Sequence, residues 1–183
     1  LGWNNTAADL ADPGFRAMQV EQMELMIRHA FNHPSIIIWG FLNEFACDTP
    51  EGEEMGKLLC DTARAWDSGR LVTFACSRPL TDVVNQYTDL VAYNTYPGWI
   101  PANEAEMQME PTESMAANQK TILQSLRSRY PEKPIMVSEM GTCGIYGQHD
   151  EANAQWTEEF QAELLNSLLT TSAEFILINK ERS

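Results

Sequence analysis

The stretch NHPSIIIWGFLNE occupies residues 32–44 and decides how the rest of the chain is interpreted. It contains an apolar, mostly β-branched run at residues 36–39, which lies between a proline and a glycine. Such a run is typical of a short strand buried on both faces of a parallel sheet. Asn43 and Glu44 follow it. Catalytic groups lie at the carboxyl ends of strands in parallel α/β barrels, so we expect Glu44 to be a general acid. The alternative is that it caps the next element or faces water.

The composition indicates a globular chain with one domain. Hydrophobic residues make up 44% of the 183 residues, which is enough for a sizeable core. The chain has 12 lysines and arginines against 26 aspartates and glutamates, so its formal net charge is −14. This acidity argues against nucleic acid and anionic membrane surfaces as partners, and no apolar run is long enough to span a membrane. A neutral or sugar-like substrate fits these numbers.

The beginning of the chain lacks the features of a signal peptide. It has neither the basic start nor the apolar core, and it opens with Leu1-Gly2-Trp3 rather than with a methionine. We therefore expect a fragment of a longer protein. The compartment stays open between the cytoplasm and a secreted or periplasmic location.

The spacing of the cysteines and histidines predicts no metal site and no cofactor. None of the four cysteines belongs to a Cys-x-x-Cys pair, and we expect buried free thiols at Cys47, Cys60, Cys76 and Cys143. His29 and His33 are four residues apart, but Pro34 ends the predicted helix beside them.

The predicted elements alternate between helices and strands. We expect helices at residues 13–31, 53–67, 112–129 and 151–171, and strands at residues 36–39, 70–75, 135–139 and 175–178. Residues 89–99 are expected to form a strand followed by an aromatic loop, and residues 1–12, 45–52, 77–88 and 141–150 to be loops. An acidic, methionine-rich surface excursion is expected at residues 100–112. This alternation predicts βαβ units, a parallel sheet with flanking helices and therefore an α/β fold.

Two of the predicted strands end in a glutamate. Glu44 and Glu139 are 139 − 44 = 95 residues apart, and in a parallel barrel both would point into the same mouth. Two facing carboxyl groups are the apparatus of glycoside hydrolysis, in which one protonates the departing oxygen. In retaining enzymes the other attacks the sugar carbon, at a carboxyl separation of about 5–5.5 Å. The alternative for Glu139 is a salt-bridged residue at the end of a strand.

Both strands resemble those of family 2 glycoside hydrolases, the β-galactosidase and β-glucuronidase group. Residues 32–44 resemble the strand that carries the acid/base, with the run Asn-His-Pro-Ser, an aliphatic stretch, Trp and Asn-Glu. Residues 133–141, KPIMVSEMG, are similar to the nucleophile strand, although Met140 replaces the usual aromatic residue. The resemblance implies that Glu44 is the acid/base and Glu139 the nucleophile of a retaining enzyme that hydrolyses β-glycosides.

The segment NTYPGW, which begins at Asn94, looks like the family's loop after the sixth barrel strand. The resemblance implies that Asn94 lines the pocket and that Tyr96 donates a hydrogen bond to the nucleophile. Trp99 would form an apolar platform for a sugar, and Asn43 would bind the 2-hydroxyl group. His149 stands where some relatives have a substrate-facing histidine. The alternatives are core packing for Tyr96 and Trp99 and a solvated loop position for His149.

The resemblance runs from about residue 2 to residue 178 and implies a partial (β/α)8 TIM barrel. Family members have β-sandwich domains before the barrel, so residues 1–183 are expected to be a fragment of a single catalytic domain. The chain would hold strands four to seven and the start of strand eight. The first three barrel strands and the sandwiches would be missing partners, and we expect the chain alone to be weakly active or inactive.

Two other functions are open at this stage. A non-catalytic barrel remnant could bind carbohydrate through Tyr96 and Trp99, but such a module has no need for two carboxylates that flank one bond. Another retaining barrel family, such as the cellulases, shares the Asn-Glu pair and a glutamate at the end of a later strand. Residues 32–34 and 94–99 favour family 2, with a lean toward its glucuronidase-like branch, which also contains galactosidases.

Overall fold

The computed structural model describes residues 2–99 and 112–180, so the excursion predicted at residues 100–112 lies outside the described residues except for Thr112. The chain forms two compact units. The first comprises Leu1–Asn94 and Arg129–Ser138, and the second comprises Thr95–Ser128 and Glu139–Ser183.

Helices and strands alternate along the chain, as predicted. In chain order the elements are α1 (Ala7–Ala11), α2 (Pro13–Ala30), β1 (Ile38–Asn43), α3 (Pro50–Trp66), β2 (Leu71–Cys76), β3 (Val91–Thr95), α4 (Thr112–Arg129), β4 (Ile135–Met140) and α5 (Glu158–Lys180). None of the described helices is both long and apolar enough to cross a membrane.

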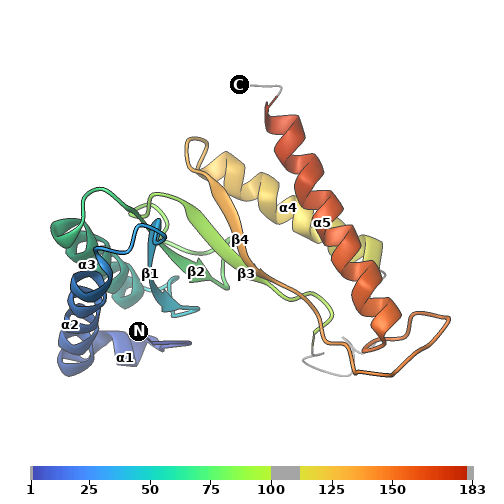
Figure 1. Cartoon of the computed structure of the whole chain (residues 1–183), viewed down its shortest axis with the longest axis horizontal. Helices are drawn as coiled ribbons and strands as arrows, with labels where there is room; N and C mark the ends of the chain where they lie inside the picture. The colour runs from blue at the N-terminus through green and yellow to red at the C-terminus, as the bar shows by residue number, and fades with distance from the viewer. Residues whose placement is uncertain (1, 100–111, 181–183) are drawn as a thin grey trace. The chain divides into compact units, whose positions relative to one another are not determined.

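The four strands form one sheet in the order β1-β2-β3-β4 (Figure 1). β1 pairs with β2 and β2 pairs with β3 in parallel, with Phe41 opposite Phe74 and Ala75 opposite Ala92. Each strand therefore lies beside its neighbour in the sequence. This is the strand order of a (β/α)8 barrel, whereas a doubly wound sheet reverses its order at a switch point. The prediction of an α/β fold with parallel strands is confirmed.

Aromatic packing fixes the carboxyl end of β1 in the first unit. The ring of Phe74 lies 5.5 Å from that of Phe41 and 4.9 Å from that of Phe45, measured between centroids. All three side chains are at most 4% exposed. Aromatic pairs of this kind add about 0.5–1.5 kcal/mol beyond the burial of their area. Phe45 directly follows Glu44, so this cluster holds the backbone on both sides of that glutamate.

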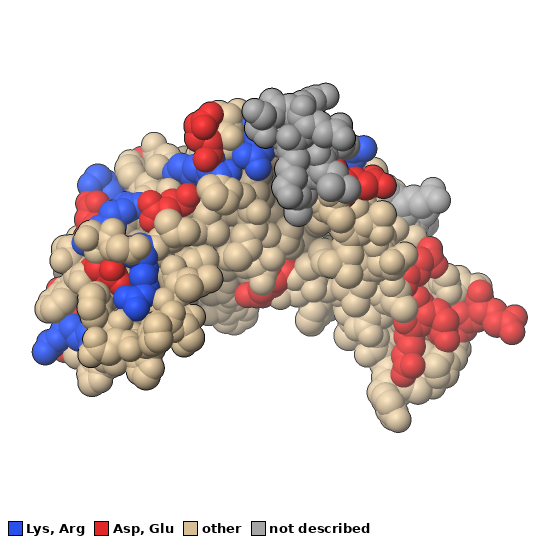
Figure 2. All heavy atoms as spheres, turned by 45° about the horizontal axis from the view of Figure 1, so that its top comes forward, with Lys and Arg blue, Asp and Glu red and all other residues tan. Residues whose placement is uncertain are grey.

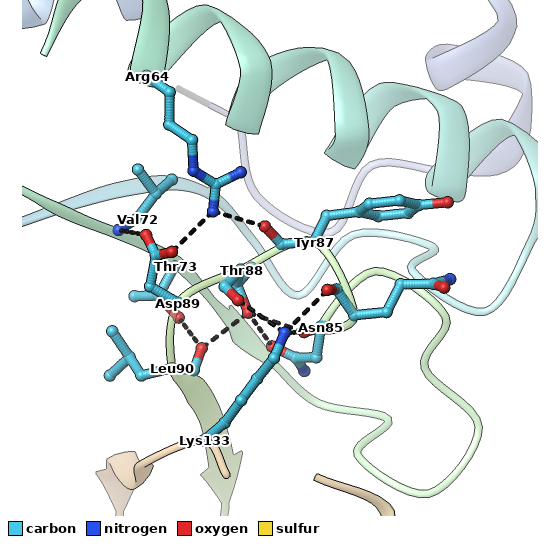
Figure 3. A network of polar contacts seen from close by, with 10 residues as sticks. Arg64, Val72, Thr73, Asn85, Tyr87, Thr88, Asp89, Leu90 and Lys133 are labelled. Carbon is cyan, nitrogen blue, oxygen red and sulfur yellow. Dashed lines mark hydrogen bonds and ion pairs between the residues drawn. The ribbon is translucent and has the colours of Figure 1, made fainter. Parts of the chain in front are cut away.

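A polar network holds the loop between β2 and β3 (Figure 3). Arg64 Nη2 donates to Asp89 Oδ1 at 2.8 Å and to the Tyr87 carbonyl at 2.7 Å, while Asp89 Oδ2 accepts the Val72 N–H at 2.7 Å. Lys133 Nζ donates to the carbonyls of Asn85, Gln86 and Thr88. Burial lowers the pKa of the Lys133 ammonium. The ion pair and the hydrogen bonds to backbone groups thus connect this loop to β2 and to the segment before β4.

The second unit has a smaller apolar core on α5. Phe160, Leu164 and Leu168 are buried at helical spacing, and Met115 and Met140 pack against them. Gln119 Nε2 donates to Ser172 Oγ at 3.1 Å, which links α4 to α5. On the face drawn in Figure 2, lysine and arginine side chains lie near acidic ones in one part of the surface. Another part carries aspartates and glutamates with no basic side chain among them, and most of the surface carries no charge.

The structure differs from the predictions at three elements of the first unit, α1, β1 and α3. Residues 1–12 were expected to be a loop, but α1 forms there because Thr6 and Asp9 make a reciprocal capping box. β1 begins at Ile38 rather than at residue 36, since the Ile36 carbonyl accepts from Arg70 Nε and Ile37 is 71% exposed. The strand also runs through the glycine to Asn43. α3 begins at Pro50 rather than at residue 53, because the Thr49 hydroxyl accepts the Gly52 N–H.

The end of the chain differs most from the prediction. α5 starts at Glu158 rather than at residue 151, because Asn153 and Trp156 have φ values of 54° and 71° and Thr157 caps the Phe160 N–H. The strand predicted at residues 175–178 is wrong, since α5 continues to Lys180. No glycine or proline interrupts the sequence between Glu158 and Lys180, so nothing local ends the helix.

Candidate active site

Glu44 lies directly after β1 with left-handed backbone. Its φ is 53°, a value that costs a residue with a side chain about 1–2 kcal/mol. Its N–H donates to the Ala75 carbonyl at 2.9 Å, so the backbone remains tied to β2 at this point. Strained conformations of this kind concentrate where a side chain must be aimed.

Both oxygens of the Glu44 carboxylate accept a hydrogen bond. Asn94 Nδ2, from β3, donates to Oε1 at 2.8 Å, and the indole Nε1 of Trp3 donates to Oε2 at 3.1 Å. Asn94 Nδ2 also donates to Asn43 Oδ1 at 3.2 Å. On its other side, Asn94 Oδ1 accepts from the Ser138 hydroxyl at 2.7 Å. Asn94 is only 5% exposed, so it is the fixed centre of this group.

The contact between Trp3 and Glu44 was not predicted from the sequence. Residues 2–4 run beside the end of β1, where the Asn43 N–H donates to the Gly2 carbonyl and the Asn4 N–H donates to the Asn43 carbonyl, both at 2.9 Å. This pairing places the Trp3 indole against Glu44. No sequence motif marks a tryptophan at this position. Its contact with Glu44 is apparent only from the pairing of residues 2–4 with the end of β1. Ser138 lies in the motif at residues 133–141, but the motif does not indicate that its hydroxyl donates to Asn94.

Glu139 lies in β4 and belongs to the second unit. The Tyr96 hydroxyl donates to Glu139 Oε2. The Tyr96 ring meets the Trp99 ring edge-on, with centroids 4.8 Å apart. The two rings are 38% and 40% exposed, so neither is ordinary core packing. In this unit the structure brings together a carboxylate, a phenol donor and an open aromatic surface.

His149 contacts two glutamates at the start of α5. Its Nδ1 is 2.7 Å from Glu159 Oε1, and its Nε2 is 3.9 Å from Glu158 Oε2, both at the start of α5. The hydrogen bond with Glu159 raises the pKa of His149 and lowers that of Glu159. The side chain is 59% exposed. His149 therefore pairs with Glu159 at the protein surface.

The predicted site residues thus fall into two groups. Asn43, Glu44 and Asn94 make direct contacts within the first unit, and Tyr96, Trp99 and Glu139 do so within the second. The chain passes from one unit to the other three times: after Asn94, after Ser128 and after Ser138. Each group offers a carboxylate with a fixed hydrogen-bond donor, which suits proton transfer or nucleophilic attack. Among the described residues, the side chains placed to share a metal ion are Cys47, Cys76 and Asp82, outside both groups.

Comparisons with known proteins identify the family. Residues 3–179 match the family described as "Glycosyl hydrolases family 2, TIM barrel domain". The β-glucuronidase of Sus scrofa is 31% identical over 147 residues, and that of Paenibacillus borealis is 32% identical over 138 residues. These alignments cover 80% and 73% of this chain but only 22% of each relative.

A solved structure supports the same assignment. The family 2 β-galacturonidase from Eisenbergiella tayi, bound to galacturonate, superposes with a TM-score of 0.77 and 29% identity. The superposition covers 92% of this chain and 29% of that one. Four strands in sequential order are what part of a barrel requires. The chain belongs to glycosyl hydrolase family 2, and it forms part of that family's TIM barrel domain.

Proposed function

We propose that this chain carries both catalytic carboxyl groups of a retaining β-glycosidase. Glu139 is the nucleophile and Glu44 is the acid/base. The observation that carries the proposal is that each glutamate stands at the carboxyl end of its strand and accepts a hydrogen bond from the end of β3 or the loop after it. Residues 1–183 are accordingly part of one catalytic domain, whose other strands and sandwich domains complete the enzyme.

The contacts suggest how the steps are divided. The Tyr96 hydroxyl donates to Glu139 and orients its carboxylate, which attacks the anomeric carbon and forms a glycosyl ester. Glu44 gives its proton to the departing glycosidic oxygen and then takes a proton from the attacking water. Asn94 keeps the Glu44 carboxyl group in one orientation. Asn43 Oδ1 accepts from Asn94, so Asn43 would bind the sugar 2-hydroxyl through its Nδ2 group.

The exposed aromatic pair suggests the surface on which the sugar lies. Trp99 is 40% exposed and its ring is braced edge-on by Tyr96, the residue that also bonds to Glu139. An apolar ring face beside the nucleophile matches the apolar face of a pyranose. His149 is the less favoured of the proposed substrate contacts, because its imidazole is engaged by Glu159.

The relatives suggest a uronic acid as the sugar. Two are named β-glucuronidases, and the third is a β-galacturonidase bound to galacturonate. We infer that the chain's enzyme prefers β-glucuronides or β-galacturonides to neutral β-galactosides. The family match also favours this reading over a cellulase, which would belong to another family.

The proposal is tested on the longer polypeptide that contains the chain. It should hydrolyse nitrophenyl β-glucuronide or β-galacturonide faster than nitrophenyl β-galactoside. Glu139→Gln should abolish turnover, whereas Glu132→Gln, at an exposed position before β4, should leave it unchanged. Turnover that survives Glu139→Gln would contradict the assignment. Binding without turnover in the wild-type protein would favour the second candidate, a carbohydrate-binding remnant, which the exposure of Tyr96 and Trp99 supports.

A further inference from the structure

Three buried side chains in the first unit bring two sulfur atoms and a carboxylate together. Cys47 Sγ and Cys76 Sγ are 3.3 Å apart, and a carboxylate oxygen of Asp82 lies with them inside a group whose members are all within 4.8 Å of one another. All three residues are 0% exposed. They come from three segments: the loop after Glu44, the last residue of β2 and the loop before β3. Nothing in the proposed glycosidase chemistry uses them.

We propose that Cys47, Cys76 and Asp82 form a binding site for a divalent ion of the zinc group. Two thiolates and one carboxylate are ligand types that zinc and cadmium accept, and binding would release the two thiol protons to solvent. Zinc–sulfur bonds of about 2.3 Å place two sulfurs of a tetrahedral site roughly 3.8 Å apart. The observed sulfur separation is a few tenths of an ångström shorter than this value, so a small side-chain rotation admits the ion.

Neighbouring groups already hold the three ligands in place. Asp82 Oδ1 accepts the Val84 N–H at 2.8 Å, and Asp82 Oδ2 lies 3.3 Å from the Tyr130 hydroxyl. The Arg78 N–H donates to Cys76 Sγ at 3.3 Å. Hydrogen bonds of this kind orient metal ligands and commonly change affinity about 10- to 100-fold when removed. The site therefore has supporting contacts on both the carboxylate and a sulfur.

A pocket lies beside residues that neighbour two of the ligands. The pocket has a volume of about 370 Å³, and its lining includes Ala46, Asp48 and Arg78. Ala46 and Asp48 are the chain neighbours of Cys47, and Arg78 bonds to Cys76. Asp48 adds a carboxylate at the opening, although it is also paired with Arg78 at 3.1 Å. An ion bound to the three ligands would cross-link the loop after Glu44 to the end of β2.

The test is a cadmium titration of the reduced 183-residue chain without oxygen. We expect one cadmium ion per chain, with the near-ultraviolet charge-transfer band of cadmium thiolates. Cys47→Ala and Cys76→Ala should each abolish the band. Cys60→Ala, which removes an equally buried thiol from α3, should keep it. Tyr130→Phe should weaken binding about tenfold by releasing Asp82.

A second measurement uses the wild-type chain, so its result does not depend on whether the variants fold. Cadmium-113 NMR of the complex should give a shift typical of a site with two sulfur ligands. A shift typical of oxygen and nitrogen ligands alone would overturn the proposal, as would the absence of the charge-transfer band. Recovery of a Cys47–Cys76 disulfide from protein kept free of oxygen would also overturn it, since the thiols would then serve as a cross-link.

Discussion

Asn94 donates to Glu44 Oε1 at 2.8 Å from a side chain that is almost completely buried. The same side chain accepts from Ser138, the residue immediately before Glu139. The proposed acid/base is therefore oriented by a residue whose position depends on the strand that carries the proposed nucleophile. Substitution of Asn94 should therefore slow the protonation of the leaving group more than it slows the other steps of the reaction.

Asn94→Ala is expected to lower kcat/KM about 10- to 100-fold, because a hydrogen bond to a charged group contributes about 1.5–3 kcal/mol. The loss should be larger for alkyl glycosides than for nitrophenyl glycosides, since a good leaving group needs less help from an acid. Steady-state kinetics of the longer polypeptide with both substrate types measure this. Asn118→Ala, at an exposed position of α4, is the control. An equal loss on both substrate types would show that Asn94 does not act through the acid.

Tyr96→Phe keeps the ring that packs against Trp99 and removes the hydroxyl that donates to Glu139. We expect kcat/KM to fall about 100-fold, a typical cost for the loss of one preorganised donor. This loss should be similar for good and poor leaving groups, in contrast to Asn94→Ala. Tyr146→Phe is the matched control, because Tyr146 is 98% exposed. If Tyr96→Phe keeps its activity within twofold of wild type, the hydroxyl has no role in the mechanism.

The left-handed backbone of Glu44 predicts an unusual order of stabilities. Glu44→Ala and Glu44→Gly both delete the carboxylate, but only glycine adopts a φ of 53° without strain. The glycine variant should therefore have a free energy of unfolding about 1 kcal/mol larger than the alanine variant. Urea unfolding of the two variants measures the difference. If alanine is as stable as glycine at this position, the conformation is not strained in solution.

The pair of His149 and Glu159 predicts a defined pH window. The carboxylate raises the pKa of His149 above its ordinary 6.5, so the pair's stabilisation is complete below that value and is lost as pH rises through the raised pKa. Glu159 has a lowered pKa, so on the acid side the stabilisation is lost as pH falls through that lowered value. NMR titration of the imidazole should show a midpoint above those of exposed histidines. Glu159→Gln should lower it, whereas Glu151→Gln should not; equal midpoints in all three proteins would contradict the pairing.

The sequence predicted the parts of the fold that depend on local pattern. Apolar residues at roughly helical spacing and a proline near its start located α2, and a proline-containing turn before residue 135 located the start of β4. α5 was misplaced because its start depends on the left-handed conformations of Asn153 and Trp156, and a tryptophan gives no sequence signal for such a conformation. Its end was misplaced because the apolar segment from Phe175 suits a strand or a helix equally well.

The candidate site shows the same division. Motifs at the strand ends marked Glu44, Asn94 and Tyr96. The structure gives these residues the hydrogen bonds Asn94–Glu44 and Tyr96–Glu139. Trp3 and the cluster of Cys47, Cys76 and Asp82 have no sequence signature. They meet only because segments distant along the chain pack beside β1 and β2, and such contacts arise from tertiary structure.

The most direct test of the central claim is covalent trapping of the proposed nucleophile. A 2-deoxy-2-fluoro β-uronyl fluoride should inactivate the longer polypeptide and leave one glycosyl group on it. Peptide mass spectrometry should locate that group on Glu139, and Glu139→Gln should prevent labelling. A label on Glu44 or on another residue, or inactivation without a covalent adduct, would contradict the account.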